Sequence, residues 1–199
     1  MLAPLTRTLA SCCEWFPLAR GTILALCLGS AVTLKTAEPT ESEIQAAYLF
    51  NFAKFVQWPA SALPERNTPV VIGLIDRDHF AQTVSSVIGT NRVNSHHVEV
   101  RLINPAEPRL DGCHLLFLSR TQSELVERML EQSNRKPILT VSDADRFASD
   151  GGMIGFVKAG GSVKFEVNLS KATEAGLKIS SKLLSLAKIV KSEPGKERK

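Results

Sequence analysis

Residues 44–59 form a stretch that is apolar around most of the circumference it would have as a helix. One side of that helix gathers apolar residues at three- and four-residue steps: Ile44, Ala47, Tyr48, Phe52 and Phe55. Further apolar residues fill much of the remaining surface: Leu49, Phe50, Ala53 and Val56. Only a narrow polar strip is left: Gln45, Asn51, Lys54 and Gln57. A helix of this kind must be covered by other elements or by a partner.

Both ends of this helix are marked in the sequence. Thr40 and Glu43 have the spacing of a capping box, in which two side chains accept hydrogen bonds from the first backbone N–H groups. Pro59 is expected to end the helix, because the residue before a proline avoids the helical conformation. Most of the apolar side chains are expected in the core. One edge is expected to stay exposed as a partner contact: Asn51, Lys54 and Trp58.

The first 37 residues have the layout of a secretory signal peptide. Arg7 and Arg20 precede an apolar run of residues 22–33, and small residues follow. This run is shorter than the roughly 20 residues that a membrane-spanning helix needs. Cleavage is expected after residue 31 or 37, with an uncleaved anchor as the alternative. Residues 38–191 are then expected to form one domain with a sizeable core, followed by a charged tail, residues 192–199.

Charge and cysteine content limit the role of the exported part. Removing the leader's three basic residues and one acidic residue lowers the net charge from +4 to +2. The basic residues are scattered apart from those of residues 182–199, so no nucleic-acid partner is expected. Three of the four cysteines lie in the leader, which leaves Cys113 without a partner for an internal disulfide. Cys113 precedes an apolar strand, so a buried inert thiol is expected, with an intermolecular bridge as the alternative.

The order of the remaining elements predicts a single three-layer α/β/α domain with a mixed sheet. Apolar or alternating runs predict strands over residues 70–75, 98–103, 114–118 and 138–141. Helical spacing predicts helices over residues 79–88 and around 125–130, so neighbouring strands should be parallel with right-handed crossovers. Residues 153–158 and 163–168 around Gly160-Gly161 predict a C-terminal antiparallel hairpin. A last helix, capped by Ser180 and Ser181, is expected to run through Val190.

The sequence contains no recognisable catalytic, metal or cofactor motif. Asp76 and Asp143 each follow a predicted strand, where open α/β sheets bind ligands, although both are better explained as loop caps. A pocket near them would make the chain a periplasmic small-molecule binding module, the alternative function. Asp76, Asp78 and His79 are too few for a metal site, and His96 and His97 would point to opposite faces of a strand. Residues 151–155 lack the glycine order of a dinucleotide site.

Three segments of the chain resemble the YfiR family. They are AAYLFNFAKFVQWP, then GCHLLFLS followed by ILTVSD, and finally GGMIGFVKAGGSVKFEVNLSKATEAGLKISSKLLSLAKIV, in which GLKISSKLL is the most specific part. The resemblance covers nearly all of residues 43–191. It implies a periplasmic α/β protein without catalytic activity. It also implies redox-sensitive disulfides in the best-known members, but Cys113 has no second cysteine in the exported part to pair with.

The resemblance further implies partners. The protein is expected to repress an inner-membrane diguanylate cyclase of the YfiN type by binding its periplasmic domain, which lowers cyclic-di-GMP and biofilm formation. A Pal-like outer-membrane lipoprotein is expected to sequester the repressor. Apolar surface that the core does not cover would also suit a homodimer. The expected partner contacts are the edge of the first helix and two polar residues of the hairpin: Asn51, Lys54, Trp58, Lys164 and Glu166.

Overall fold

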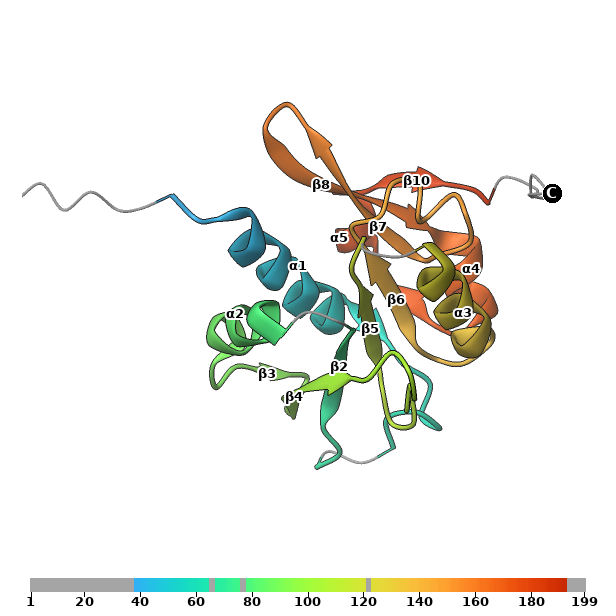
Figure 1. The fold of residues 1–199 in the computed structure, drawn as a ribbon. Coiled ribbons are helices and arrows are strands. Elements are labelled where there is room, and N and C mark those ends of the chain that lie inside the picture. The colour runs from blue at the N-terminus through green and yellow to red at the C-terminus, as the bar shows by residue number, and fades with distance from the viewer. Residues whose placement is uncertain (1–37, 65–66, 76–77, 121–122, 193–199) are drawn as a thin grey trace, which may run out of the picture. The chain divides into compact units, whose positions relative to one another are not determined.

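The computed structural model describes residues 38–64, 67–75, 78–120 and 123–192. Within them, one sheet of eight strands has the order β10-β8-β7-β6-β5-β2-β4-β3 (Figure 1). The expected signal peptide, residues 1–37, and residues 193–199 of the expected tail lie outside the described residues. In chain order, the strands of this sheet are β2 (Val70–Ile75), β3 (Arg92–Val93), β4 (His96–Ile103), β5 (Leu115–Leu118), β6 (Leu139–Ser142), β7 (Ile154–Ala159), β8 (Ser162–Asn168) and β10 (Lys188–Val190).

Parallel pairing dominates the centre of the sheet. β2 lies between β4 and β5, β5 pairs with β6, and β6 pairs with β7, all in parallel. Two of these steps are helical crossovers, through α2 (Asp78–Ile88) and α3 (Ser123–Ser133), as the order of elements predicts. β7 and β8 form the predicted antiparallel hairpin, with Phe156 opposite Phe165. The structure therefore confirms the mixed sheet.

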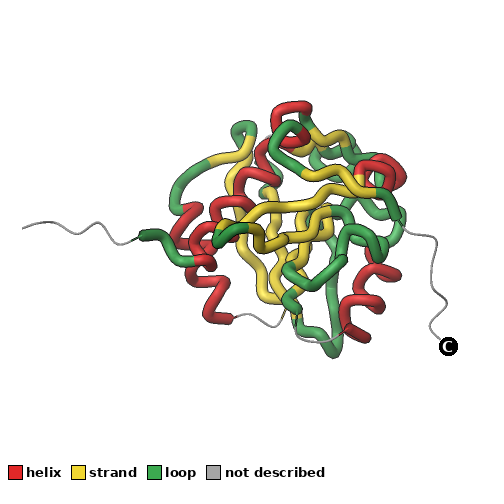
Figure 2. The backbone as a smooth tube through the Cα atoms, turned by 90° about the horizontal axis from the view of Figure 1, so that it is seen from above, coloured by secondary structure: helices red, strands yellow, loops and turns green. Residues whose placement is uncertain are grey.

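Helices cover both faces of the sheet, as two views show (Figures 1 and 2). Alternation along the buried strands gives each face its own core. Leu115 and Phe117 of β5 belong to the core beneath α1 (Glu41–Phe55) and α2. Leu116 and Leu118 belong to the opposite core, beneath Met129 of α3. This arrangement confirms the predicted three layers and explains why the central strands are apolar without interruption.

An aromatic cluster in the first of these cores fixes α1 to the hairpin. The ring centre of Phe52 lies 5.0 Å from that of Phe165 and 5.7 Å from that of Phe156. Tyr48, one turn earlier, lies 5.3 Å from Phe165 and donates its hydroxyl to the carbonyl of Val163 at 3.4 Å. Such edge-to-face and stacked pairs add to the energy of burial. The first helix is therefore a core element, as its composition predicts.

The ends of α1 agree with the sequence at the start and differ at the finish. The N–H of Glu43 donates to Oγ1 of Thr40 at 3.3 Å, and the N–H of Thr40 donates to Oε2 of Glu43 at 2.7 Å, which confirms the capping box. Hydrogen bonds from Thr40 lower the pKa of Glu43. The helix ends at Phe55 and not just before Pro59, because the next two residues, Val56 and Gln57, pair with a distant segment as a strand.

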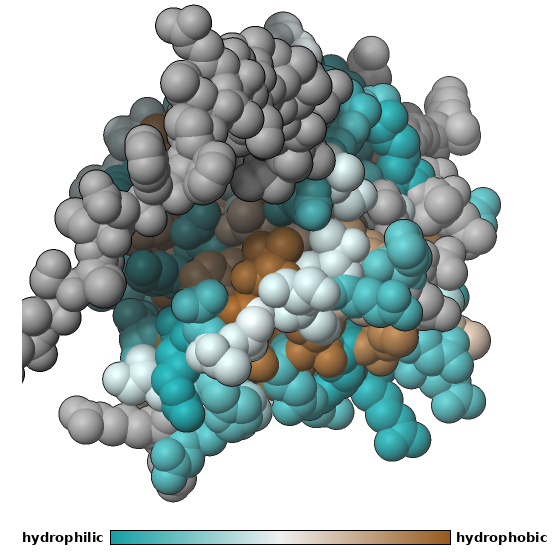
Figure 3. Space-filling model, turned by 90° about the vertical axis from the view of Figure 1, so that its left-hand side faces the viewer, coloured by the Kyte–Doolittle hydropathy of each residue, from teal (hydrophilic) through white to brown (hydrophobic). Residues whose placement is uncertain are grey.

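The buried stripe of α1 also differs from the expected one. Gln45 was expected in the polar strip, but it is only 4% exposed, whereas Ile44 and Phe50 are half-buried. The reason is that α1 packs along α2 as well as against the sheet, so its burial depends on two neighbours. Figure 3 shows apolar side chains gathered on the side of the molecule where α1 and α2 lie.

The expected last helix is wrong beyond its first turn. Ser180 caps α5 (Ser181–Leu184), but the chain then leaves the helix and forms β10. β10 pairs in parallel with β8, with Ile189 beside Val167. Apolar residues at short spacing suit a helix or a strand equally, and here β8 supplies backbone partners for the β-branched Ile189 and Val190. The C-terminal segment therefore closes one edge of the sheet.

Candidate partner-binding surface

Two short strands join the end of α1 to the C-terminal segment. β1 (Val56–Gln57) pairs antiparallel with β9 (Lys178–Ile179), so that Val56 faces Ile179 and Gln57 faces Lys178. Val56 and Ile179 are buried, whereas Gln57 and Lys178 are exposed, as alternation along a strand requires. The pairing brings together two of the segments that resemble the YfiR family, although 120 residues separate β1 from β9 in the chain.

The residue after β9 extends this pairing and starts the next helix. The N–H of Ser180 donates to the carbonyl of Phe55 at 3.0 Å. Its hydroxyl accepts a hydrogen bond from the N–H of Leu183 at 3.3 Å, which makes Ser180 the N-cap of α5. Leu183 is buried in the core beneath α1. These contacts fix α5 against the end of α1 and thereby position the exposed Lys182 of α5.

Lysine side chains surround the half-buried ring of Phe55. The Nζ atom of Lys182 lies 5.3 Å from the centre of this ring, and that of Lys54 lies 5.8 Å from it. Both distances are in the range of cation–π contacts. Lys178 extends from the adjoining strand on the exposed side of the β1–β9 pair. We call this area the α1–α5 surface, and it consists of Asn51, Lys54, Phe55, Lys178 and Lys182.

Two large apolar side chains of the C-terminal segment are exposed. Leu186 is 69% exposed and Ile189 is 56% exposed. Ile189 lies beside Val167, whose side chain is buried in the core beneath α1, so the two side chains share a face. Large apolar side chains next to charged ones are typical of surfaces that bind other proteins.

The structure separates the five predicted contact residues. Asn51 and Lys54 are exposed and lie on one side of α1, three residues apart. Lys164 and Glu166 alternate along β8 with Phe165, which contacts α1, so they face the opposite side of the sheet. Oε1 of Glu166 also forms an ion pair with Nζ of Lys188 at 2.8 Å. The five residues therefore cannot form one contiguous contact area.

Trp58, the fifth predicted contact residue, is half-buried and forms a hydrogen bond with the interior of the domain. Its Nε1–H donates to the carbonyl of His114 at 3.1 Å, and its ring meets the His114 ring edge-to-face at 5.9 Å. His114 accepts a hydrogen bond at Nδ1 from the N–H of Val71, so its Nε2 carries the proton that is donated to the carbonyl of Ala62 at 3.0 Å. Trp58 therefore anchors the chain after β1, besides any role at the surface.

The buried imidazole of His114 predicts a loss of stability in mild acid. Burial is the main cause that lowers the pKa of His114. A proton added at Nδ1 would also remove the acceptor of the hydrogen bond from the N–H of Val71. Between this lowered value and about 6.5, the unfolded chain binds more protons, so the free energy of unfolding should fall as the pH drops below about 6.5. Urea unfolding from about pH 7.5 to 5.5 measures this slope.

A matched pair of variants assigns the slope to His114. His114→Asn keeps an acceptor for Val71 and removes the titration, so its stability should be lower at neutral pH but should depend less on pH over this range. His97→Asn is the control, because His97 is exposed on β4. Equal slopes in the wild type and His114→Asn would show that His114 does not carry the effect.

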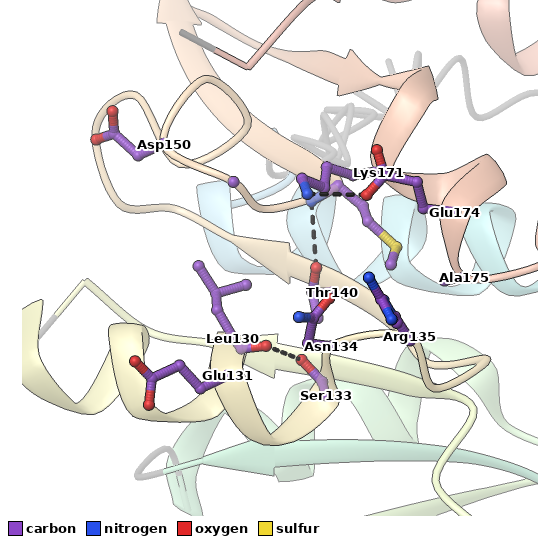
Figure 4. A pocket seen from close by; sticks show the side chains of 12 residues that line it. Leu130, Glu131, Ser133, Asn134, Arg135, Thr140, Asp150, Lys171, Glu174 and Ala175 are labelled. Carbon is purple, nitrogen blue, oxygen red and sulfur yellow. Dashed lines mark hydrogen bonds and ion pairs between the residues drawn. The ribbon is translucent and has the colours of Figure 1, made fainter. Parts of the chain in front are cut away.

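Two cavities lined by described residues give little support to a small-molecule site. One, of about 210 Å³, lies between the end of α3 and α4 (Leu169–Glu174) (Figure 4). Polar groups around it bond to one another: Lys171 to Glu174 at 2.8 Å, and the N–H of Met153 to Oγ1 of Thr140 at 3.1 Å. The other, of about 240 Å³, lies near the carboxyl ends of β5 and β6. Both are smaller than the roughly 300–1,000 Å³ of typical ligand pockets.

Asp143 acts as a cap at these strand ends. Its Oδ1 accepts the backbone N–H of Arg120 at 2.8 Å, and its carbonyl accepts the Arg120 guanidinium at 3.1 and 2.9 Å. Arg120 also pairs with Asp145 at 3.1 Å. The interpretation of Asp143 as a loop cap is confirmed, whereas Asp76 lies outside the described residues. Arg120 and Asp145, two of the charged residues that line the second cavity, are thus engaged in contacts between the ends of β5 and β6.

The remaining candidate groups give no reactive site in the described part of the chain. No three His, Cys, Asp or Glu side chains among the described residues gather as metal ligands. His96 is buried and His97 exposed, as their alternation predicts. Cys113 is buried, its Sγ–H donates to the carbonyl of Leu115 at 3.1 Å, and burial raises its pKa to about 11. The thiol is therefore held in its unreactive protonated form.

Together, the fold and the α1–α5 surface define a mixed α/β domain that presents lysine and apolar side chains to its surroundings. The chain belongs to the YfiR/HmsC-like family, whose model matches residues 42–188. This family consists of periplasmic regulators of diguanylate cyclases and is regulatory and not catalytic. No curated protein matches the chain in sequence. No described helix has the length and apolar character needed to cross a membrane.

The sequence identified Lys54 but missed Lys178 and Lys182 as its neighbours. Both lie in GLKISSKLL, the segment with the most specific resemblance, so a signal was present. What the sequence lacked was the pairing of residues 56–57 with 178–179, which is set by tertiary packing and by no local pattern.

Proposed function

We propose that this protein is a periplasmic repressor that binds the periplasmic part of an inner-membrane diguanylate cyclase of the YfiN type. Membership of the YfiR/HmsC-like family supports a regulatory role toward such a cyclase. The observation that carries the binding role is the meeting of two family-like segments in the α1–α5 surface, where their lysines are exposed. Repression lowers the level of cyclic-di-GMP and with it the formation of biofilm.

Repression of this kind needs no chemistry in the chain itself. A bound protein shifts a two-state equilibrium only by the ratio of its affinities for the two states. Moving a cyclase from almost entirely active to almost entirely inactive requires a ratio of about 10⁴. The α1–α5 surface suits this task because the β1–β9 pair and the Ser180 cap hold it in place before binding, which reduces the entropy lost on association.

A second partner would release the cyclase by withdrawing the repressor. We propose a Pal-like outer-membrane lipoprotein in this role, because a competitor that binds the free repressor lowers its occupancy on the cyclase by mass action. Lys164 and Glu166 remain proposed partner contacts. Because they face the side of the sheet opposite α1, we propose that they contact the lipoprotein. The repressor therefore offers two separate faces to two partners.

Export is part of the same proposal. Residues 1–37 have the layout of a signal peptide, and residues 38–191 contain the domain that would act in the periplasm. Because Cys113 is the only cysteine after residue 37, the repressor would not depend on an internal disulfide. Fractionation of cells that express the full chain should place the protein in the periplasm, and a cytoplasmic location would contradict the proposed function.

The role can be tested in the bacterium that produces the protein. Deletion of the gene should raise cyclic-di-GMP severalfold, measured by mass spectrometry, and expression of the wild type should restore the low level. Lys54→Glu should restore it less completely, because it reverses a charge on the α1–α5 surface. Lys136→Glu, an equal charge change at an exposed position after α3, is the control. Unchanged cyclic-di-GMP after deletion would contradict repression.

A further inference from the structure

We propose that the α1–α5 surface binds an acidic, extended peptide segment of its protein partner. Lys54, Lys178 and Lys182 would contact the carboxylates of this segment, and the ring of Phe55 would support its backbone. The inference rests on the proposed function for the identity of the partner and adds the chemistry by which the partner is recognised. Two of these lysines lie over the same aromatic ring, that of Phe55.

Three other lysines of the domain have carboxylate partners within the chain. Lys158 pairs with Glu41, Lys171 with Glu174 and Lys188 with Glu166, each at 2.8 Å. Among the described residues, no carboxylate forms an ion pair with the lysines of the α1–α5 surface: Lys54, Lys178 and Lys182. Within the described part of the chain, the surface therefore carries positive charge that no ion pair neutralises, and a negatively charged partner would complement it.

The geometry around Phe55 holds two of these charges close together. The ammonium groups of Lys54 and Lys182 lie 5.8 and 5.3 Å from the centre of the same ring. Like charges repel, so this arrangement is most favourable when an anion lies between or beside them. The backbone of Phe55 is held in place, because its carbonyl accepts the N–H of Ser180 at 3.0 Å. The two lysines are thus positioned before a partner arrives.

An acidic peptide fits this surface better than a membrane does. Recognition of anionic lipids commonly uses about four to eight clustered Lys or Arg residues, and the α1–α5 surface has three lysines. Lysines act as separate point charges, which suits carboxylates spaced along a chain, whereas a single phosphate is commonly held by the fork of an arginine. The exposed Ile189, on the same side of the sheet as α1, adds an apolar contact suited to a protein.

The test measures binding of a labelled deca-glutamate peptide to the purified full chain by fluorescence anisotropy, with deca-glutamine as the uncharged control. The wild type should bind deca-glutamate and not deca-glutamine. The double variant Lys54→Glu/Lys182→Glu should bind about tenfold more weakly, and the affinity of the wild type should fall as salt screens the contact. Arg135→Glu/Lys136→Glu carries the same charge change at exposed positions after α3 and should bind like the wild type.

The alternatives give different results. Equal binding by the two double variants would overturn the assignment to this surface, as would no binding of deca-glutamate by the wild type. Binding to phosphatidylglycerol vesicles that depends on Lys54 and Lys182, without peptide binding, would replace the peptide by a membrane and overturn the inference. The proposed function fails separately, if loss of the chain leaves cyclic-di-GMP unchanged. Circular dichroism of each variant establishes that it is folded.

Discussion

Replacement of Phe52 by alanine is expected to lower the free energy of unfolding by about 3–5 kcal/mol. Phe52 is fully buried, and its ring contacts Tyr48 of α1, Phe156 of β7 and Phe165 of β8. Its removal leaves a cavity between α1 and the hairpin, which the surrounding rings cannot fill without leaving their own positions. Urea unfolding followed by circular dichroism measures the loss.

Phe50→Ala is the matched control for this prediction. It removes the same side chain from the same helix, but Phe50 is only half-buried, so the expected loss is less than half as large. Phe52→Leu provides a milder variant if Phe52→Ala does not fold. Equal losses for Phe50→Ala and Phe52→Ala would mean that α1 does not pack on the sheet through the face described.

The second large effect is expected from Gly152→Ala, which should cost about 2–3 kcal/mol. A Cβ atom at Gly152 would meet the ring of Phe147 well inside van der Waals contact. Phe147 is itself buried in the core beneath α3, so its ring has no free space to enter. The chain after β6 can return closely over the sheet only because residue 152 has no side chain.

A double-mutant cycle with Phe147→Leu tests this explanation. The smaller leucine makes room for the added methyl group, so the double variant should lose less stability than the two single variants predict together. Thermal unfolding of the four proteins supplies the comparison. Additive losses would show that the cost of Gly152→Ala does not come from contact with Phe147.

The strands of the fold were predictable where burial leaves a strong pattern. β2 has the predicted bounds because its six residues are buried on both faces and are apolar without interruption. The hairpin was signalled by Gly160 and Gly161, which both have positive φ in the turn. Residues 185–190 were not predictable in the same way, because their apolar spacing fits a helix and only the edge of β8 selects the strand.

The site was only partly predictable, for a related reason. Lys54 and Asn51 follow from the polar strip of one helix, which is a local pattern. The neighbours Lys178 and Lys182 arrive through pairing across the fold, and Trp58 turns inward to a carbonyl that no spacing reveals. Side chains alternate between the two faces along β8, so Lys164 and Glu166 lie on the face opposite Phe165. The sequence does not show that Phe165 packs against α1, and it therefore could not place Lys164 and Glu166 away from that helix.

The central claim is that this chain represses a membrane diguanylate cyclase by binding its periplasmic part. The most direct test uses the full-length cyclase of the same bacterium in nanodiscs, where both sides of the membrane protein are accessible. The rate of cyclic-di-GMP synthesis from GTP is measured as the purified chain is added. We expect a saturable fall in rate that is weaker for Lys54→Glu/Lys182→Glu. An unchanged rate at saturating concentrations of the wild-type chain would contradict it.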